Sequence, residues 1–192
     1  MYKRQARTIH WKASARYNRL QEKIFEPSAQ AKALLVVDVE GFAKNRAEGE
    51  FERTLEIAAS LAVRLERQGY ALGLVTNGAV VGGGTAMLRI ARNPQKLPAI
   101  LELFARLKME PERDLKEPFV RGLKLPWGVS AVHFSYEAGE TAHFAERYFA
   151  HRKIPAVFIV ARLGPIKGRL GRQVGGKIYH IDDIRLEGAE GT

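Results

Sequence analysis

The distribution of apolar and polar positions along the chain predicts alternating strands and helices. The unbroken apolar run from Ala31 to Val37 is typical of a strand buried on both faces in a parallel sheet. From Phe51 to Gln68, apolar residues recur at three- and four-residue spacing, which predicts an amphipathic helix. A second short buried strand, YALGLVTNG, begins at Tyr70 and ends in the turn signal Asn77-Gly78.

The alternation continues to the C-terminal region. Val80 and Val81 can extend the second strand as a hairpin, and Asn93-Pro94 opens a helix whose apolar face runs to Leu107. The stretch 108–128 is interpreted as a long connection, with strand or helix there unresolved. Further strands are predicted at 129–134, 156–160 and 177–181, and a helix at 140–151. This order favours an α/β fold, a doubly wound and mostly parallel sheet with helices on both faces.

The length of 192 residues predicts one α/β domain, over residues 31–187, with two flanking segments. Residues 1–30 are interpreted as a basic N-terminal extension packed on the core, with a half-exposed edge strand near Leu20 to Phe25. Residues 188–192 are expected to form a disordered tail. With 46% hydrophobic and 27% charged residues, the chain can bury a sizeable core.

The charge balance adds a preference for anionic partners. Lys and Arg number 31 against 21 Asp and Glu, a formal charge of +10 that concentrates phosphates, nucleic acids or anionic lipid surfaces near the protein. No RNA-recognition, zinc-finger or helix-turn-helix signature accompanies this charge, so nucleic acid is not the favoured partner. Cysteine is absent, which excludes disulfides, thiol catalysis and thiolate metal sites.

One segment near the N-terminus carries a recognisable signature. RTIHWKASARYNRLQEKIFEP, from Arg7 to Pro27, is followed by the strand ALLVVDVEG and then by FERTLEIAASLAVRLERQGYALGLVTNG. From about Arg4 to about Leu107 the chain resembles the bacterial family known as domain of unknown function fifty-eight. The resemblance implies a von Willebrand factor A-like domain and a MoxR-type AAA+ ATPase as partner, since members are typically encoded beside such ATPases.

Many members of that family carry transmembrane helices ahead of this segment. No stretch of this chain approaches the roughly 20 apolar residues of a membrane helix. We therefore expect either an excised domain or a naturally short member. The expected location is cytoplasmic, as a free protein or as the cytoplasmic domain of a membrane-anchored parent, with membrane association only through a segment missing from this chain.

The acidic corner DVEGF follows the first buried strand. In von Willebrand A domains this place holds a metal through the pattern DxSxS, so the resemblance makes Asp38 and Glu40 candidate ligands of magnesium or manganese. Glu40 and Phe42 stand where that pattern has serines, and Phe42 offers no oxygen. No cofactor is therefore expected, with this metal site as the alternative. Asp38 can instead hydrogen-bond the backbone of its own loop. Further oxygen ligands would have to come from Thr76, Thr85, Ser135 or Glu137.

Other motifs give little support for catalysis. The run Gly82 to Gly84, followed by Thr85, lacks the GxxxxGK[ST] spacing of a phosphate-binding loop, and no GxSxG turn is present. The glycine-rich stretch 164–176 is read as an exposed connector or as a mobile basic loop that contacts an anionic partner. The histidines show no metal-ligand spacing; they are His10, His133, His143, His151 and His180. The sequence therefore indicates a protein that is not an enzyme.

The remaining hypothesis is a binding role. Trp and Arg often anchor interfaces, so Trp11, Lys12 and Arg16 form a candidate partner-binding surface. Alternatively, Trp11 packs under the N-terminal segment, and Arg7 and Arg16 pair with acids that fix this segment on the sheet. We expect a non-enzymatic scaffold domain that works with a MoxR-type AAA+ ATPase. The alternatives are a basic module for nucleic acid or anionic surfaces and a metal-dependent adhesion-like domain. The predicted partner-binding residues are Arg7, Trp11, Lys12, Arg16, Asp38 and Glu40.

Overall fold

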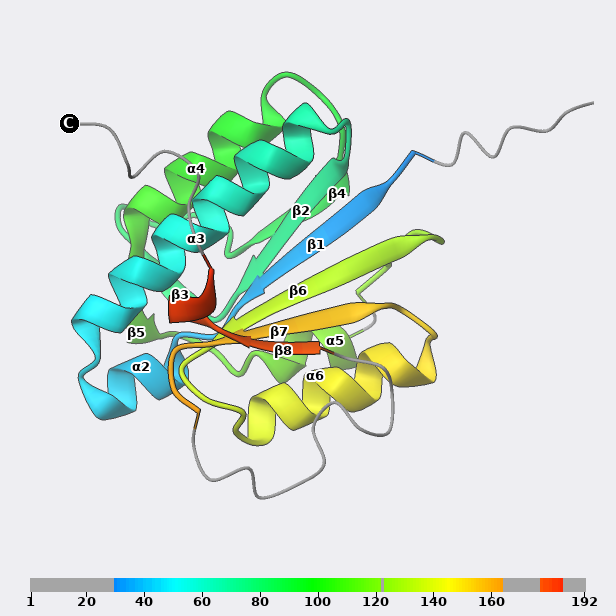
Figure 1. Cartoon of the computed structure of the whole chain (residues 1–192). Helices are drawn as coiled ribbons and strands as arrows, with labels where there is room; N and C mark the ends of the chain where they lie inside the picture. Colours follow the sequence, from blue (N-terminus) through cyan, green and yellow to red (C-terminus); the bar gives the residue numbers. More distant parts are fainter. Residues whose placement is uncertain (1–29, 122, 164–176, 185–192) are drawn as a thin grey trace, which may run out of the picture.

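The protein is built around a six-stranded sheet (Figure 1), seen in a computed structural model that describes residues 30–121, 123–163 and 177–184. The strand order is β4-β2-β1-β6-β7-β8, with β4 antiparallel to β2 and the other pairs parallel. This order is that of a Rossmann-type doubly wound sheet, so the predicted α/β fold with a mostly parallel sheet is confirmed. The strands are β1 (Lys32–Val37), β2 (Ala71–Thr76), β4 (Met87–Ala91), β6 (Val129–Ser135), β7 (Ala156–Val160) and β8 (Lys177–His180).

Strand β1 lies inside the sheet because its side chains are apolar on both faces. It pairs with β2 on one side and with β6 on the other. Ala33, Leu35 and Val37 contribute to one hydrophobic cluster, whereas Leu34 and Val36 contribute to the cluster on the opposite face. None of the five is more than 2% exposed. The unbroken apolar run of the sequence is thus explained by burial on both sides.

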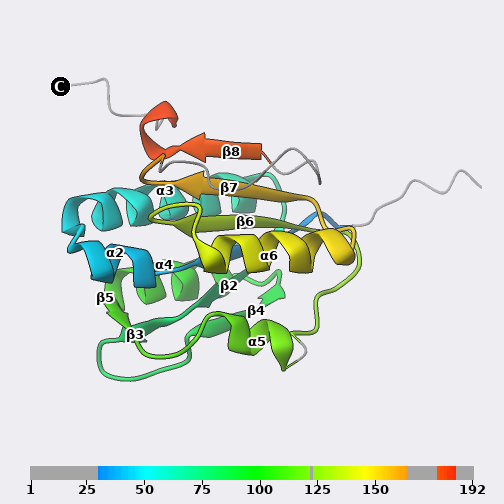
Figure 2. The ribbon, with the colours of Figure 1, turned by 90° about the horizontal axis from the view of Figure 1, so that it is seen from below.

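Helices cover both faces of the sheet, as predicted (Figure 2). The short α2 (Glu40–Asn45), α3 (Glu48–Arg67) and α4 (Lys96–Arg106) supply buried side chains to one cluster. The short α5 (Lys116–Val120) and α6 (Glu140–His151) supply the other. In Figure 2, α6 crosses in front of the sheet and α3 lies behind it. This three-layer arrangement, helices on each side of the sheet, leaves the ends of the strands open for a site.

The prediction that Val80 and Val81 extend the second strand as a hairpin is wrong. Strand β3 (Gly78–Val80) does not pair with β2; it pairs with β5 (Leu107–Pro111) in a separate two-stranded sheet, and β4 takes the place beside β2. A Cβ atom on Gly78 would lie 2.7 Å from Leu107 Cδ1 and 2.9 Å from the carbonyl oxygen of Lys108. Glycine therefore allows β5 to approach β3, and the chain leaves the large sheet directly after Asn77.

Other boundaries also shift. The stretch between Asp38 and the helix predicted from Phe51 contains α2. Helix α3 begins at Glu48 instead of Phe51. The connection 108–128 contains most of β5 and all of α5. The N-terminal extension, including the strand expected near Leu20 to Phe25, lies outside the described residues except for its last position. The stretch 164–176 and the tail 188–192 lie outside them as well. Among the helices that the structure describes, none is both long and apolar enough to cross a bilayer.

Candidate binding site at the carboxyl end of the sheet

A cleft of about 550 Å³ opens where β1 and β6 end. From β1 the chain proceeds outward to β2 and β4, and from β6 it proceeds in the opposite direction to β7 and β8. The strand order thus reverses between β1 and β6, and in open α/β sheets this switch point is where ligands bind. The cleft is lined by α2, the segment before α5, the end of β6 and the start of α6.

Asp38 occupies the first position after β1 and is held in place by hydrogen bonds. Its backbone N–H donates to the carbonyl of Phe134, which extends the pairing of β1 with β6 by one residue. Its Oδ1 accepts from the backbone N–H of Glu40 at 3.1 Å. The side chain is 6% exposed, so one carboxylate oxygen serves as an internal cap for the loop that starts α2.

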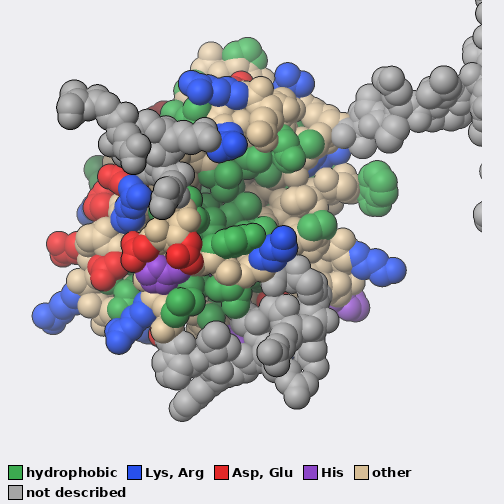
Figure 3. Space-filling model, in the orientation of Figure 1, with side chains coloured by type: hydrophobic (Ala, Val, Ile, Leu, Met, Phe, Trp, Pro, Cys, Tyr) green, Lys and Arg blue, Asp and Glu red, His purple; other side chains and the backbone are tan. Residues whose placement is uncertain are grey.

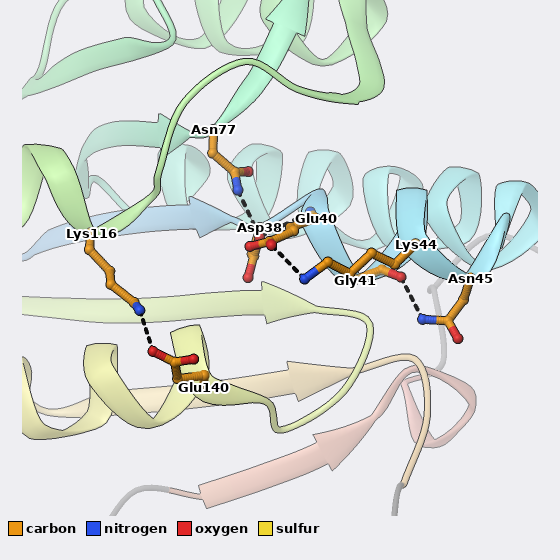
Figure 4. Close-up of polar contacts among 8 residues, drawn as sticks. All are labelled: Asp38, Glu40, Gly41, Lys44, Asn45, Asn77, Lys116 and Glu140. Atoms are coloured by element: carbon orange, nitrogen blue, oxygen red, sulfur yellow. Dashed lines mark hydrogen bonds and ion pairs between the residues drawn. The ribbon is translucent and has the colours of Figure 1, made fainter.

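Asn77 is the partner of Asp38 on the neighbouring strand (Figure 4). Its Nδ2 donates to Asp38 Oδ1 at 2.8 Å, and its Oδ1 accepts from the backbone N–H of Val39 at 2.9 Å. Asn77 is 1% exposed. The amide therefore connects the ends of β1 and β2 and satisfies two polar groups that burial would otherwise leave unpaired.

Close packing fixes the position of α2 against the end of β6. A Cβ atom on Gly41 would lie only 2.8 Å from Tyr136 Cβ, so a side chain at this position would push α2 away from the sheet. Phe42 is fully buried, and its ring contacts Phe51 and Tyr136 at centroid distances of 5.6 Å each. The third and fifth positions of DVEGF therefore both depart from the serines of the DxSxS pattern. Glu40 carries a charge, and Phe42 is a core residue.

Two ion pairs frame the cleft. Lys44 Nζ lies 2.6 Å from Glu40 Oε1 along α2, and Lys116 Nζ lies 2.5 Å from Glu140 Oε1 between α5 and α6 (Figure 4). The hydrogen bond and charge of Lys116 lower the pKa of the Glu140 carboxyl, and Glu140 in turn raises the pKa of Lys116. The hydrogen bond from Lys44 to Glu40 likewise raises the pKa of Lys44. Because of these shifts, Lys44, Lys116 and Glu140 are charged at neutral pH.

The cleft is acid-rich although the protein as a whole is basic. On the face drawn in Figure 3, acidic side chains gather at the left, where α3 and the 3-10 helix η2 (Ile181–Asp183) lie in Figure 1, so acidic side chains also cluster outside the cleft. Six acidic residues line the cleft against three basic ones, so its net charge is negative. The acidic residues are Asp38, Glu40, Glu112, Asp114, Glu137 and Glu140, and the basic ones are Lys44, Arg113 and Lys116.

A buried histidine lies in the sheet near the cleft. His133 of β6 pairs in register with Val36, is fully buried, and its ring lies 5.4 Å from that of Phe158. Neither ring nitrogen has a hydrogen-bond partner among the described residues. Burial lowers the pKa of His133 from its ordinary value of 6.5 to about 4, against the opposing effect of the Asp38 carboxylate. His133 is therefore neutral at physiological pH.

The residues at this corner do not fit a magnesium or manganese site. Such ions require several oxygen ligands in near-octahedral geometry. One oxygen of Asp38 already accepts two hydrogen bonds, and Glu40 is paired with Lys44. The Ser135 hydroxyl donates to the carbonyl of Glu137. The part of the chain that the structure describes contains no group of three or more acidic, histidine or cysteine residues placed to hold a metal.

The arrangement also lacks the contacts of a nucleophilic triad. Asp38, His133 and Ser135 lie near one another at the ends of β1 and β6. However, no hydrogen bond joins these three side chains in the described structure, and the Ser135 hydroxyl is used as a donor to a backbone carbonyl. A serine nucleophile needs a base within hydrogen-bond reach. The cleft thus presents charged side chains at the end of the sheet, and the described structure shows no hydrogen-bonded serine, histidine and acid in it.

The structure brings some of the predicted residues together and separates others. Asp38, Glu40, Ser135 and Glu137 all line the cleft. Thr76 is buried and accepts a hydrogen bond from the backbone N–H of Gly78. Thr85 lies elsewhere, beside β4. The predicted partner-binding residues Arg7, Trp11, Lys12 and Arg16 lie outside the described residues.

Sequence reasoning missed three contributors to the site. The pair Asn77-Gly78 indicates a turn in the sequence. A buried asparagine directly after a strand can also bridge to a neighbouring strand, and Asn77 does so here. Gly41 carried a signal, since a glycine inside an acidic motif often marks a close approach of backbones. The Lys116–Glu140 pair had no local signal, because its members are 24 residues apart and meet only through the fold.

Comparison with models of protein families gives a match for the N-terminal half of the chain. The model of the family described as "Protein of unknown function DUF58" matches residues 4–93, a stretch that contains Asp38, Glu40 and Asn77 and ends before α4. A search of curated proteins finds no match. The cleft therefore combines residues within the matched stretch with residues beyond it, from α5, β6 and α6. The similarity to the DUF58 family is therefore shown for residues 4–93 of the 192-residue chain.

Proposed function

We propose that this chain is a non-enzymatic protein-interaction domain whose carboxyl-end cleft binds a basic segment of a protein partner. The observation that carries the proposal is the excess of acidic side chains at the switch point of the sheet. A negative cleft on a rigid α/β framework attracts Lys and Arg side chains and repels acidic competitors. The overall charge of +10 keeps most other surfaces of the protein unattractive to the same partner.

We further propose that the domain is of the von Willebrand A-like type. Support comes from the sheet order with an antiparallel edge strand at β4, and from an aspartate directly after the central strand β1. In this proposal the corner keeps the shape of an adhesion site and has replaced the metal by internal hydrogen bonds. Asn77 and the backbone of Glu40 donate to Asp38 where a cation would otherwise attract it.

The proposed partner is a MoxR-type AAA+ ATPase. This assignment rests on the family resemblance alone. The cleft adds a chemical criterion: the contacting segment of the ATPase should carry exposed Lys or Arg residues. We propose Trp11, Lys12 and Arg16, which lie outside the described residues, as a second contact with the ATPase.

Binding of the purified ATPase to the purified chain tests the proposal directly. Glu112 and Glu137 are exposed on two different walls of the cleft, and the side chain of Glu137 has no hydrogen bond or ion pair within the described structure. We expect the double variant Glu112→Lys and Glu137→Lys to weaken binding by about tenfold or more, because it replaces attraction with repulsion. Isothermal titration calorimetry gives the affinities.

The matched control is the double variant Glu52→Lys and Glu66→Lys. Both residues are exposed on α3, and the change in net charge is the same. The control should bind within about twofold of wild type. Equal weakening in the two double variants would point to net charge alone, and no binding by the wild-type chain would reject the ATPase as partner.

A further inference from the structure

A second cavity, here called the lateral groove, lies on the α5 side of the sheet and encloses about 780 Å³. It runs over β1, β2 and β4 and is bounded by α5 and the stretch after it. Because α5 has only five residues, it does not cover this half of the sheet as α6 covers the other half. The floor is aliphatic: the core side chains of Leu34 and Val75 lie at its base, and the half-buried Ile90, Leu123 and Leu125 line it.

A glycine under β4 gives the groove its depth. A Cβ atom on Gly73 would lie 2.6 Å from Ile90 Cγ1 and 3.0 Å from both the backbone nitrogen of Ile90 and the carbonyl oxygen of Leu88. The pairing of β2 with β4 contains a register shift between Leu72 and Leu74, typical of a β-bulge. Ile90 can therefore lie flat over β2 and form part of the floor.

The rim of the groove is basic. Four cationic residues line it against one acid, Glu117, which pairs with Arg121 at 2.6 Å. Arg113 pairs with Glu112 at 3.1 Å. Within the described structure, Arg89 and Lys124 form no ion pair and both are exposed, so two positive charges are available to a ligand.

The edge of β4 is less suited to binding another strand than the groove is to binding side chains. β4 is the first strand of the sheet, so one side of its backbone has no neighbouring strand in the described structure. Two of its carbonyls are already occupied: that of Met87 accepts from the Thr85 hydroxyl, and that of Arg89 accepts from Lys96 Nζ. Such capping discourages edge pairing. A ligand is therefore expected on the face of the sheet, where the aliphatic floor lies.

We infer that the lateral groove is a docking site for an acidic amphipathic segment of a protein partner, with aliphatic side chains on the floor and Asp or Glu facing Arg89 and Lys124. This inference is independent of the acid-rich cleft and of the ATPase. The volume of the lateral groove is within the range of about 300–1,000 Å³ that ligand pockets occupy. Insertion of an amphipathic segment into an apolar groove is a common mode of peptide recognition.

Two other kinds of anionic partner fit the groove less well. Nucleic-acid sites stack bases on aromatic rings, and the described lining of the groove contains no aromatic residue. A bilayer surface is flat and contacts protruding side chains, whereas the aliphatic residues here form the bottom of a hollow. The proposal therefore takes a peptide segment as the ligand, and DNA and vesicles become controls.

Selection from a phage-displayed library of random dodecamer peptides on the whole chain tests the inference. We expect enriched peptides to combine Leu, Ile or Met with several Asp or Glu. Fluorescence anisotropy then measures the affinity of the best peptide for wild type, for the groove double variant Arg89→Glu and Lys124→Glu, and for the control Arg67→Glu and Arg92→Glu. Arg67 and Arg92 are exposed and lie outside the groove lining.

The groove variant should bind the peptide about tenfold or more weakly, and the control within about twofold of wild type. Enrichment of basic or charge-free peptides, or equal weakening in both variants, would overturn the inference. So would an absence of enriched peptides together with groove-dependent binding of phosphatidylserine vesicles or of a single-stranded DNA 20-mer. Peptide binding in the single variant Glu137→Lys, which changes the cleft and lies outside the groove lining, should equal that of wild type, and this separates the result from the fate of the proposed function.

Discussion

The carboxyl-end cleft and the lateral groove share the segment before α5 and carry opposite charges. The cleft has six acidic and three basic lining residues, and the groove has one acidic and four basic. Arg113 lines both. The cleft is bounded by ion pairs and hydrogen-bonded loops, whereas the groove has an aliphatic floor. The formal charge of +10 describes neither cavity, so the overall charge of a protein is a poor guide to the partner of a particular site.

The two regions share one structural device. In each, a glycine allows a neighbouring side chain to approach the backbone: Gly41 beneath Tyr136 at the cleft and Gly73 beneath Ile90 in the groove. They differ in what lies under them. The sheet near the cleft contains the neutral, buried His133, whereas the groove rests on aliphatic side chains. The following predictions use that difference, from the largest expected effect to the smallest.

Acid should destabilise the protein through His133. Its pKa is about 4 in the folded chain and 6.5 ordinarily, so between these values the unfolded chain binds more protons. The free energy of unfolding should therefore fall as pH decreases from 6.5 to 4, by about 3 kcal/mol from this residue. Urea unfolding at a series of pH values measures it. Because carboxylates titrate in the same range, the informative quantity is the difference between wild type and His133→Leu, and superimposable pH profiles would contradict the prediction.

Filling the space above Gly73 should destabilise the fold and alter the groove together. In Gly73→Ala the new methyl group meets backbone atoms of β4 as well as Ile90, so we expect a loss of about 2 kcal/mol in the free energy of unfolding. Thermal unfolding followed by circular dichroism measures this. The control is Gly49→Ala, where a Cβ atom meets nothing within 4 Å on helix α3 and a small gain in stability is expected. Equal behaviour of the two variants would show that β4 is not closely packed on β2.

Asp38 should stabilise the cleft because its Oδ1 accepts hydrogen bonds, and its negative charge should contribute little. Asp38→Ala leaves the amide of Asn77 and the backbone N–H of Glu40 without their acceptor, at a cost of about 2 kcal/mol. Asp38→Asn retains an oxygen at this position and should cost less than half as much. A double-mutant cycle with Asn77→Ala would give the coupling between the two side chains. Similar losses for the two Asp38 variants would mean that the negative charge itself matters.

Divalent metal should have the smallest effect. Because the oxygens at the corner are already committed to hydrogen bonds and an ion pair, calorimetric titration with manganese chloride should give no binding heat above dilution. The unfolding midpoint should be unchanged in millimolar magnesium. Saturable heat that disappears in Asp38→Asn would restore the metal-dependent adhesion-like alternative.

Much of the fold could be predicted from the sequence because burial leaves a local pattern. The apolar run at β1 and the helical spacing of α3 and α6 each reflect contact with a core, and each was placed correctly to within a few residues. The pairing of β3 with β5 could not be predicted in this way. It depends on contacts between residues about 30 positions apart, and its sign in the sequence, Gly78, fits a turn equally well.

The candidate site was predictable only in part. Asp38 and Glu40 follow a buried strand, which marks the carboxyl edge of a sheet, and they do line the cleft. The net charge of the cleft arises from side chains of three separate stretches, 38–44, 112–116 and 137–140, and has no signature in any one of them. The lateral groove was missed for a related reason: it exists because α5 is short and Gly73 lacks a side chain, and neither fact is visible before the strands are paired.

Calorimetric titration of two charge-reversed variants with the proposed partner, a MoxR-type ATPase, tests the proposed opposite roles of the cleft and the groove most directly. We predict that Glu112→Lys with Glu137→Lys weakens binding by about tenfold or more, and that Arg89→Glu with Lys124→Glu leaves it within about twofold of wild type. Loss of binding in the groove variant with retention in the cleft variant would contradict the account.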